Sequence, residues 1–198
     1  MQKVCLIVFF ICLFFRQDAL PYDECFDGSC YTHLNSGWSV QGGVGCVKTG
    51  IKWHKKYNRY KELKKLNTYF YIAVSHTGGD VCQGPSVLNM EMLSFRPASQ
   101  ALAEFEKRIK KAIDWCWLAA NNKLKFTRKN ISTPFETDNL LEVNLFLYSD
   151  GTIGKTFVRM ETAHPLTGRN FHWMHFNRQD LTRLKNDISA LRRSIQAD

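Results

Sequence analysis

The sequence lacks most of the signatures that would place it in a familiar enzyme class. It has no Gly-x-Ser-x-Gly motif, so a Ser–His–Asp triad has no usual anchor. No run of cysteines or carboxylates accompanies its histidines, and His172-x-x-His175 would point to opposite faces of a strand, so no metal site is expected. No cofactor is expected either. After residue 15 no apolar run is long enough to cross a bilayer, which takes about 20 residues.

The one long apolar run lies at the N-terminus. Lys3 precedes the run Val4 to Phe15, which is too short to span a bilayer but typical of a secretory signal peptide. Cleavage is expected near Ala19. The sequence therefore predicts a signal peptide at 1–19 and a single secreted, extracellular domain at 20–198, without stable membrane insertion.

Cysteine is scarce once the leader, with Cys5 and Cys12, is set aside. The remaining cysteines are Cys25, Cys30, Cys46, Cys82 and Cys116. In an oxidising compartment they allow two disulfides and one leftover thiol, but the sequence does not give the pairing. The odd cysteine is either buried or joins two chains, so a disulfide dimer stays open.

A possible modification site follows the first half of the chain. Asn130-Ile131-Ser132 is an N-glycosylation sequon in a polar stretch, which makes Asn130 a candidate glycosylation site.

The stretch from Asn139 to Ile195 carries the clearest fold signals. Residues 141–148 alternate apolar and polar or aromatic side chains, Asp150-Gly151 favours a hairpin turn, and strands are expected at about 153–162 and 171–176. Asn177 is a good N-cap for a helix. That helix has an apolar stripe at steps of three and four residues: Leu181, Leu184, Ile188, Leu191 and Ile195.

The first half repeats this order of strands followed by a helix. Strands are expected at 68–75 and 87–95, and a helix at about 97–120. The sequence thus predicts an α+β fold, with antiparallel sheets and two packed helices. The segments 37–120 and 124–198 could be a pseudo-repeat, two tandem strand-rich and helix units. A similar layout occurs in some single-strand nucleic-acid binders, which is an analogy of layout only.

Glycines at 42, 43 and 45 resemble a phosphate-binding loop. Such a loop needs a helix N-terminus directly after it, whereas strand-like sequence follows here. We therefore interpret these glycines as a bend or bulge.

Basic residues outnumber acidic ones, and the formal net charge is +9. Lys48 to Lys65 holds eight Lys or Arg against one acid, Glu62, with aromatic residues interleaved. Cations neutralise phosphates or sulfates, and rings stack on bases or sugars. The alternative is a solvated hairpin whose aromatics pack inward. The predicted polyanion-binding residues are Lys52, Trp53, Lys55, Lys56, Tyr57, Arg59, Lys61, Lys64 and Lys65.

These patterns favour a binding protein over an enzyme, because no coherent catalytic set is visible. The first hypothesis is a secreted basic binding or effector protein that contacts an extracellular polyanion or a partner protein. One alternative is a small secreted basic nuclease, which could use two histidines and a lysine for phosphodiester cleavage. Another is a single-strand nucleic-acid binder. The sequence names no specific target and leaves the oligomeric state open.

Overall fold

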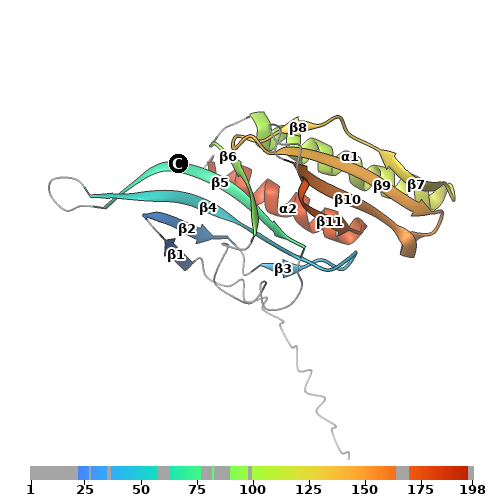
Figure 1. Ribbon diagram of the computed structural model, residues 1–198, viewed down its shortest axis with the longest axis horizontal. Coiled ribbons are helices and arrows are strands. Elements are labelled where there is room, and N and C mark those ends of the chain that lie inside the picture. The colour runs from blue at the N-terminus through green and yellow to red at the C-terminus, as the bar shows by residue number, and fades with distance from the viewer. Residues whose placement is uncertain are drawn as a thin grey trace, which may run out of the picture.

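The computed structural model describes residues 22–26, 28–34, 37–57, 63–76, 82, 90–97, 100–163 and 170–195. Within these ranges the chain is an α+β protein with two antiparallel sheets and two helices, which confirms the predicted fold class (Figure 1). No helix in the described part is both long and apolar enough to span a membrane. The expected signal peptide lies outside the described residues, so it stays a prediction.

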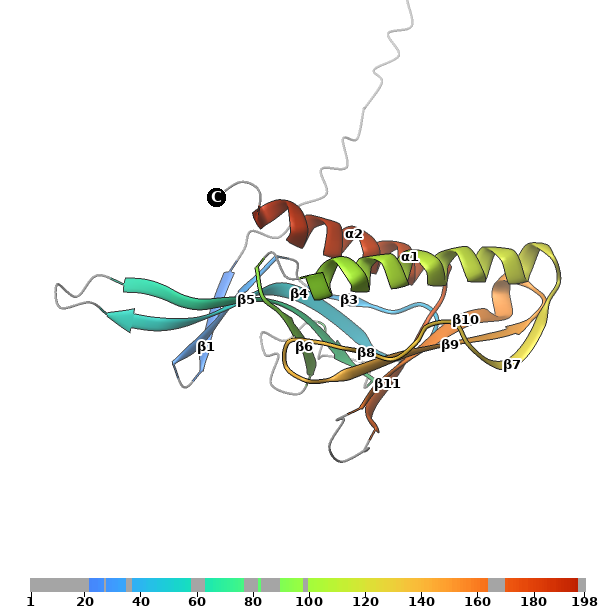
Figure 2. The same cartoon turned by 90° about the horizontal axis from the view of Figure 1, so that it is seen from above.

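Six of the described strands form the first sheet, in the order β1-β2-β4-β5-β6, with β3 paired to β4. Their bounds are β1 (Tyr22–Phe26), β2 (Ser29–His33), β3 (Trp38–Ser39), β4 (Cys46–Tyr57), β5 (Leu63–Ser75) and β6 (Glu91–Phe95). β4 and β5 are longer than their neighbours, so their paired ends extend beyond the body of the molecule (Figures 1 and 2). We call this extension, residues 54–57 and 63–66, the arm.

The second sheet has the order β11-β10-β9-β7, with β8 paired to β9. Its strands are β7 (Lys125–Asn130), β8 (Phe135–Glu136), β9 (Glu142–Asp150), β10 (Thr156–Ala163) and β11 (Asn170–Phe176). The strand expected from residue 153 begins later, because a 3-10 helix, η2 (Ile153–Lys155), precedes it. The Asp150 carboxylate accepts hydrogen bonds from the Thr152 amide and hydroxyl at 3.0 and 2.7 Å, which widens the turn.

The two helices, α1 (Gln100–Asn121) and α2 (Arg178–Ile195), lie side by side over both sheets, on the same side of each (Figure 2). The predicted stripe on α2 is buried at Leu181, Leu184, Ile188 and Leu191, while the side chain of Ile195 lies outside the described part. On α1 the side chains of Leu102, Phe105 and Ile109 are buried in the same way. Each such side chain contributes about 1.5–3 kcal/mol before conformational entropy is subtracted. These stripes join residues of both sheets in one continuous hydrophobic core. The opposite faces of the sheets are therefore not covered by the helices.

The glycine bend packs against the N-terminus of α2. Asp180 accepts hydrogen bonds from the amides of Gln41 and Gly42 at 2.8 and 2.7 Å, and from Asn177 N at 2.9 Å. Asn177 caps the helix in return, through a bond from Asp180 N at 2.9 Å. A Cβ on Gly42 would lie 2.4 Å from Asn177 N, so this close approach requires glycine. The glycines form a bend, as predicted, and a carboxylate of the protein itself occupies the helix N-terminus.

Candidate functional site

The face of the second sheet that points away from the helices carries aromatic and cationic side chains. On β9 the inward residues Val143, Leu145 and Leu147 are buried, while Phe146 and Tyr148 alternate with them and are partly exposed. The same alternation gives β10 and β11 their outward residues, which are Phe157, Arg159, Trp173 and His175. Side chains alternate between the two faces of a strand, and the helices cover only one face of this sheet, so these side chains share the other face.

Strand register sets the outward rings next to one another. Phe157 pairs with Tyr148 across β9 and β10, and Arg159 pairs with Phe146 on one side and His175 on the other. Cross-strand neighbours of this kind have Cβ atoms about 4.5–5.5 Å apart, which brings aromatic side chains into contact.

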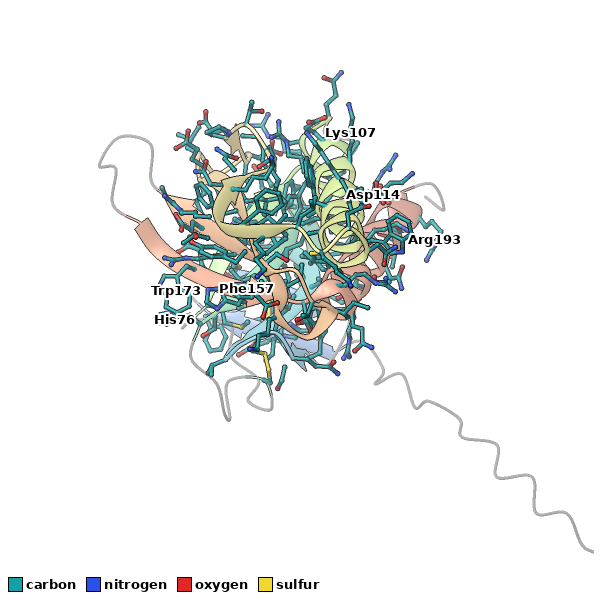
Figure 3. All side chains as sticks on the ribbon, turned by 90° about the vertical axis from the view of Figure 1, so that its right-hand side faces the viewer. His76, Lys107, Asp114, Phe157, Trp173 and Arg193 are labelled. Carbon is teal, nitrogen blue, oxygen red and sulfur yellow. A yellow bond between two sulfur atoms is a disulfide. The ribbon has the colours of Figure 1, made fainter. Side chains whose placement is uncertain are left out.

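These rings form a chain of contacts that we call the aromatic row: Tyr148, Phe157, His175, Trp173 and His76. Their successive ring-centroid distances are 5.0, 4.5, 4.9 and 6.4 Å. The last member, His76, follows β5, so the row crosses from the second sheet to the first. Figure 3 shows Phe157, Trp173 and His76 gathered on the side of the molecule away from α1, which carries Lys107 and Asp114.

Two arginines are held against rings of this face by one buried carboxylate. Glu161 is 6% exposed and forms ion pairs with Arg159 at 2.9 Å and Arg128 at 3.4 Å. Arg128 lies 3.8 Å from the centroid of Phe146, and Arg159 lies 4.7 Å from that of Trp173. Each contact is a cation–π stack. Glu161 thus fixes two planar cations on a surface that is otherwise aromatic.

The Arg159 cation also affects the histidine next to it. Burial lowers the pKa of His175 from its ordinary value of 6.5, and the charge of Arg159 lowers it further. At neutral pH His175 is therefore an uncharged ring, and the fixed positive charge of the face comes from Arg128 and Arg159.

Sequence reasoning treated these residues as ordinary strand positions and missed the face. A signal was present, because aromatic residues and arginine occupy the outward positions of three consecutive predicted strands. Its meaning depended on which face the helices cover, and the periodicity of each strand leaves that open.

The predicted polyanion-binding residues lie on β4, β5 and the loop between them. In the arm the backbone of Lys55 pairs with that of Lys65, and the backbone of Lys56 with that of Lys64. The side chains of Lys56, Tyr57, Lys64 and Lys65 lie outside the described part, as do Arg59 and Lys61 entirely. The arm therefore concentrates lysines along the backbone, while the role of the predicted residues other than Trp53 stays a prediction.

Two aromatic or basic residues of that stretch are not at the surface. Trp53 is 2% exposed and donates a hydrogen bond from Nε1 to Thr32 at 3.0 Å, so the expectation that it stacks on a ligand is corrected. Lys48 is fully buried, and this burial lowers its pKa. Lys52 is partly exposed and lies 5.6 Å from the ring centroid of Tyr31.

The predicted two disulfides and one leftover thiol are confirmed. The bridges join Cys25 to Cys30 and Cys46 to Cys82. Cys116 is free and buried, and burial raises the pKa of its thiol to about 12. Such a thiol is inert near neutral pH and is not placed to join two chains. Asn130 is exposed at the end of β7, and its glycosylation stays a prediction.

The nuclease alternative requires two imidazoles and a cation at one phosphate. His33 is 1% exposed and contacts Glu24 at 3.0 Å and the Tyr71 hydroxyl, so it cannot reach a ligand. His54 contacts the Ser29 hydroxyl at 3.3 Å. His76 and His175 both belong to the aromatic row. In the described ranges no group of three or more His, Cys, Asp or Glu side chains is placed to hold a metal ion.

No protein-family model and no curated protein matches the chain. Among solved structures it is similar to WHY3 from Arabidopsis thaliana, with a TM-score of 0.36 and 8% identity over 78% of this chain and 85% of that one. The structure of WHY1 from the same plant matches with a TM-score of 0.36 and 8% identity, over 78% of this chain and 87% of that one. The structure of the plant transcriptional regulator PBF-2 matches with a TM-score of 0.38 and 10% identity, over 81% of this chain and 82% of that one.

The first function hypothesis, a secreted basic binding or effector protein, is therefore corrected. One of these three structures is titled as a plant transcriptional regulator, and none of the three is titled as a secreted effector. The likeness is distant, so the function proposed next is taken from the chain's own surface.

Proposed function

We propose that this chain binds single-stranded nucleic acid on the outer face of the second sheet. The observation that carries the proposal is the aromatic row, which stands beside Arg128 and Arg159 on a sheet face that the helices leave uncovered. A ring that stacks on a base contributes about 1–3 kcal/mol, and an arginine adds cation–π and phosphate contacts.

Unpaired bases fit this surface better than a duplex. The bases of a duplex are stacked on one another and show only their edges in the grooves, so rings on an open sheet cannot stack on them. A single strand can splay its bases onto aromatic side chains while its phosphates contact cations. Stacking depends little on base identity, so binding with weak sequence preference is expected.

The lysine-rich arm supplies a second kind of contact. The backbone pairs Lys55 with Lys65 and Lys56 with Lys64, and lysines gathered in this way favour contact with a phosphate backbone. In the proposed complex, the sheet face contacts bases and the arm contacts phosphates.

Fluorescence anisotropy with labelled 12-nucleotide DNA and RNA, single-stranded or as a duplex, tests the proposal. We expect tighter binding to the single strands, and Phe157→Ala to weaken it by about 5- to 100-fold, the range for one lost stack. Trp117→Ala is the matched control, because Trp117 is 52% exposed on α1, away from this face. Equal affinity for duplex and single strand, or equal loss in both variants, would contradict the proposal.

The same samples separate binding from cleavage. A protein that only binds leaves the oligonucleotide at full length after long incubation, with or without a chelator. Metal-independent cleavage that is lost in His175→Ala would instead assign the aromatic row to a nuclease.

We also propose that the chain acts in an oxidising compartment outside the cytosol. The bridges Cys25–Cys30 and Cys46–Cys82 support this, because disulfides persist mainly in secreted or surface-exposed proteins. Expression of the full-length chain in cultured cells tests it. Recovery of a disulfide-bonded product in the medium is expected, and a reduced product confined to the cytosol would reject it.

A further inference from the structure

We infer that His76 and Trp173 form a clamp that holds one unpaired base between their rings. This inference rests on the proposed single-strand binding and assigns the base a defined position within it. The two rings are nearly parallel, with an interplanar angle of 28° and centroids 6.4 Å apart. Both residues are exposed, so a base can approach them from solvent.

The spacing of this pair differs from that of the other ring pairs in the aromatic row. A flat ring between two others requires about 7 Å, twice the roughly 3.5 Å contact distance of carbon atoms. The Tyr148–Phe157, Phe157–His175 and His175–Trp173 centroids are 5.0, 4.5 and 4.9 Å apart, so these pairs already touch. The His76–Trp173 centroids are 6.4 Å apart, the widest spacing in the row, and the two rings must separate further before a base can enter.

The position of the pair in the fold permits that opening. Trp173 belongs to β11 at one edge of the second sheet, while His76 follows β5 in the first sheet. The two strands belong to separate sheets and share no hydrogen-bonded ladder, so their side chains can separate without breaking a sheet. By contrast, the other pairs of the row lie within the second sheet, on neighbouring paired strands or on one strand.

The surroundings of the clamp favour a base over a phosphate. The space that the two rings border is closed in this structure, and it is also lined by the buried side chains of Val74, Met160, Thr162 and Met174, most of which are apolar. An apolar floor favours the flat body of a base, and the stacked Arg159, 4.7 Å from the Trp173 centroid, supports the orientation of the indole. A clamp of this kind recognises the shape of a flat ring, so it accepts any of the bases.

A scan of abasic sites through a 12-nucleotide single strand tests the inference on the full chain. If one base occupies the clamp, removal of the base at one position should weaken binding about 5- to 100-fold. In Trp173→Ala and in His76→Ala, removal of the same base should weaken binding little further. The reason is that the base and the ring that it contacts form one interaction, which either change already removes. Trp117→Ala, on α1 and outside both the aromatic row and the arm, is the matched control and should keep the full penalty.

Photo-crosslinking provides a second readout that does not depend on affinity. A 5-bromouracil placed at the sensitive position should crosslink to Trp173 or His76, as mapped by peptide mass spectrometry. If Phe157→Ala weakens binding but the clamp variants do not, or if crosslinks map only to Tyr148 and Phe157, the clamp is rejected and the binding face stands. If the unmodified chain binds no single strand, the proposed function and the clamp both fail.

Discussion

At the scale of single residues, His175 shows how the sheet face sets the chemistry of its own side chains. Burial, together with the charge of Arg159, lowers the pKa of this imidazole. The unfolded chain, with a pKa near 6.5, then binds a proton more readily than the folded chain. The stabilisation from the neutral ring is complete above about pH 6.5 and is lost as the pH falls below that value.

We therefore predict that His175→Gln reduces the loss of stability between pH 7.5 and pH 5.5. Urea unfolding at the two pH values measures the effect, and the wild-type chain should lose more unfolding free energy than the variant. His54→Gln is the control, because His54 lies outside the aromatic row. An identical pH dependence in the wild type and His175→Gln would show that another group titrates in this range.

At the scale of elements, the bend at 41–44 and the N-terminus of α2 act as one unit. The bend donates two amides to Asp180, which also caps its own helix. The contact joins residues that are almost 140 positions apart in the sequence. It therefore connects the first sheet to the last helix through a single carboxylate.

Gly42→Ala is predicted to destabilise the fold, because its Cβ would meet Asn177 N at 2.4 Å. We expect a loss of about 1–3 kcal/mol, as for other overpacked sites. Gly154→Ala is the matched control, since a Cβ at Gly154 meets nothing within 4 Å and should change stability by less than about 0.5 kcal/mol. Chemical denaturation measures both variants, and equal stability of the two would mean that the bend can move away from the helix.

The arm makes a prediction about salt dependence that follows from the proposed function. Lys55→Gln with Lys65→Gln removes one cross-strand pair of charges. If both lysines contact phosphates, the slope of log K against log salt should fall by about 1.4, since each contact to a single strand contributes about 0.7. Lys107→Gln with Lys110→Gln on α1 is the control, and its slope should not change. A slope that is unaltered by the arm variant would remove the arm from the interface.

At the scale of the whole molecule, two sheets and two helices share one hydrophobic core. Both helices cover the same side of the two sheets (Figure 2). The free face of the second sheet is a consequence of this arrangement. Two helices over two sheets bury one side of each sheet and leave the other to solvent or to further chain.

The two disulfides should differ in their effect on global stability. Cys46 and Cys82 are separated by 36 positions and Cys25 and Cys30 by 5, and a longer closed loop restricts the unfolded chain more. From loop entropy alone, Cys46→Ser with Cys82→Ser should cost about 4 kcal/mol, and Cys25→Ser with Cys30→Ser about 2 kcal/mol. Urea unfolding of the two variants measures the difference. The reverse order would show that native packing around β1 and β2 outweighs loop entropy.

The sequence by itself determined the elements of this protein. Period-two alternation on residues 141–148, the apolar stripe of α2 and the Asn177 cap are local patterns, and the described residues confirm each of them. The boundaries of η2 and β10 were missed, because the side chain of Asp150 builds a wider turn than Asp-Gly alone predicts. Local physics is enough to decide where a strand or helix runs, and to within a few residues where it ends.

Only the tertiary structure decided which faces are open and which side chains meet. Trp53 and Lys55 are two positions apart in a basic stretch, yet Trp53 is buried and Lys55 is exposed, because β2 pairs with β4 at Trp53 and its ladder ends at His54. The contact between His76 and Trp173 joins positions from different sheets, and no spacing along the chain encodes it. Burial and proximity depend on how elements pack over one another, and that packing is a property of the whole core rather than of any single segment.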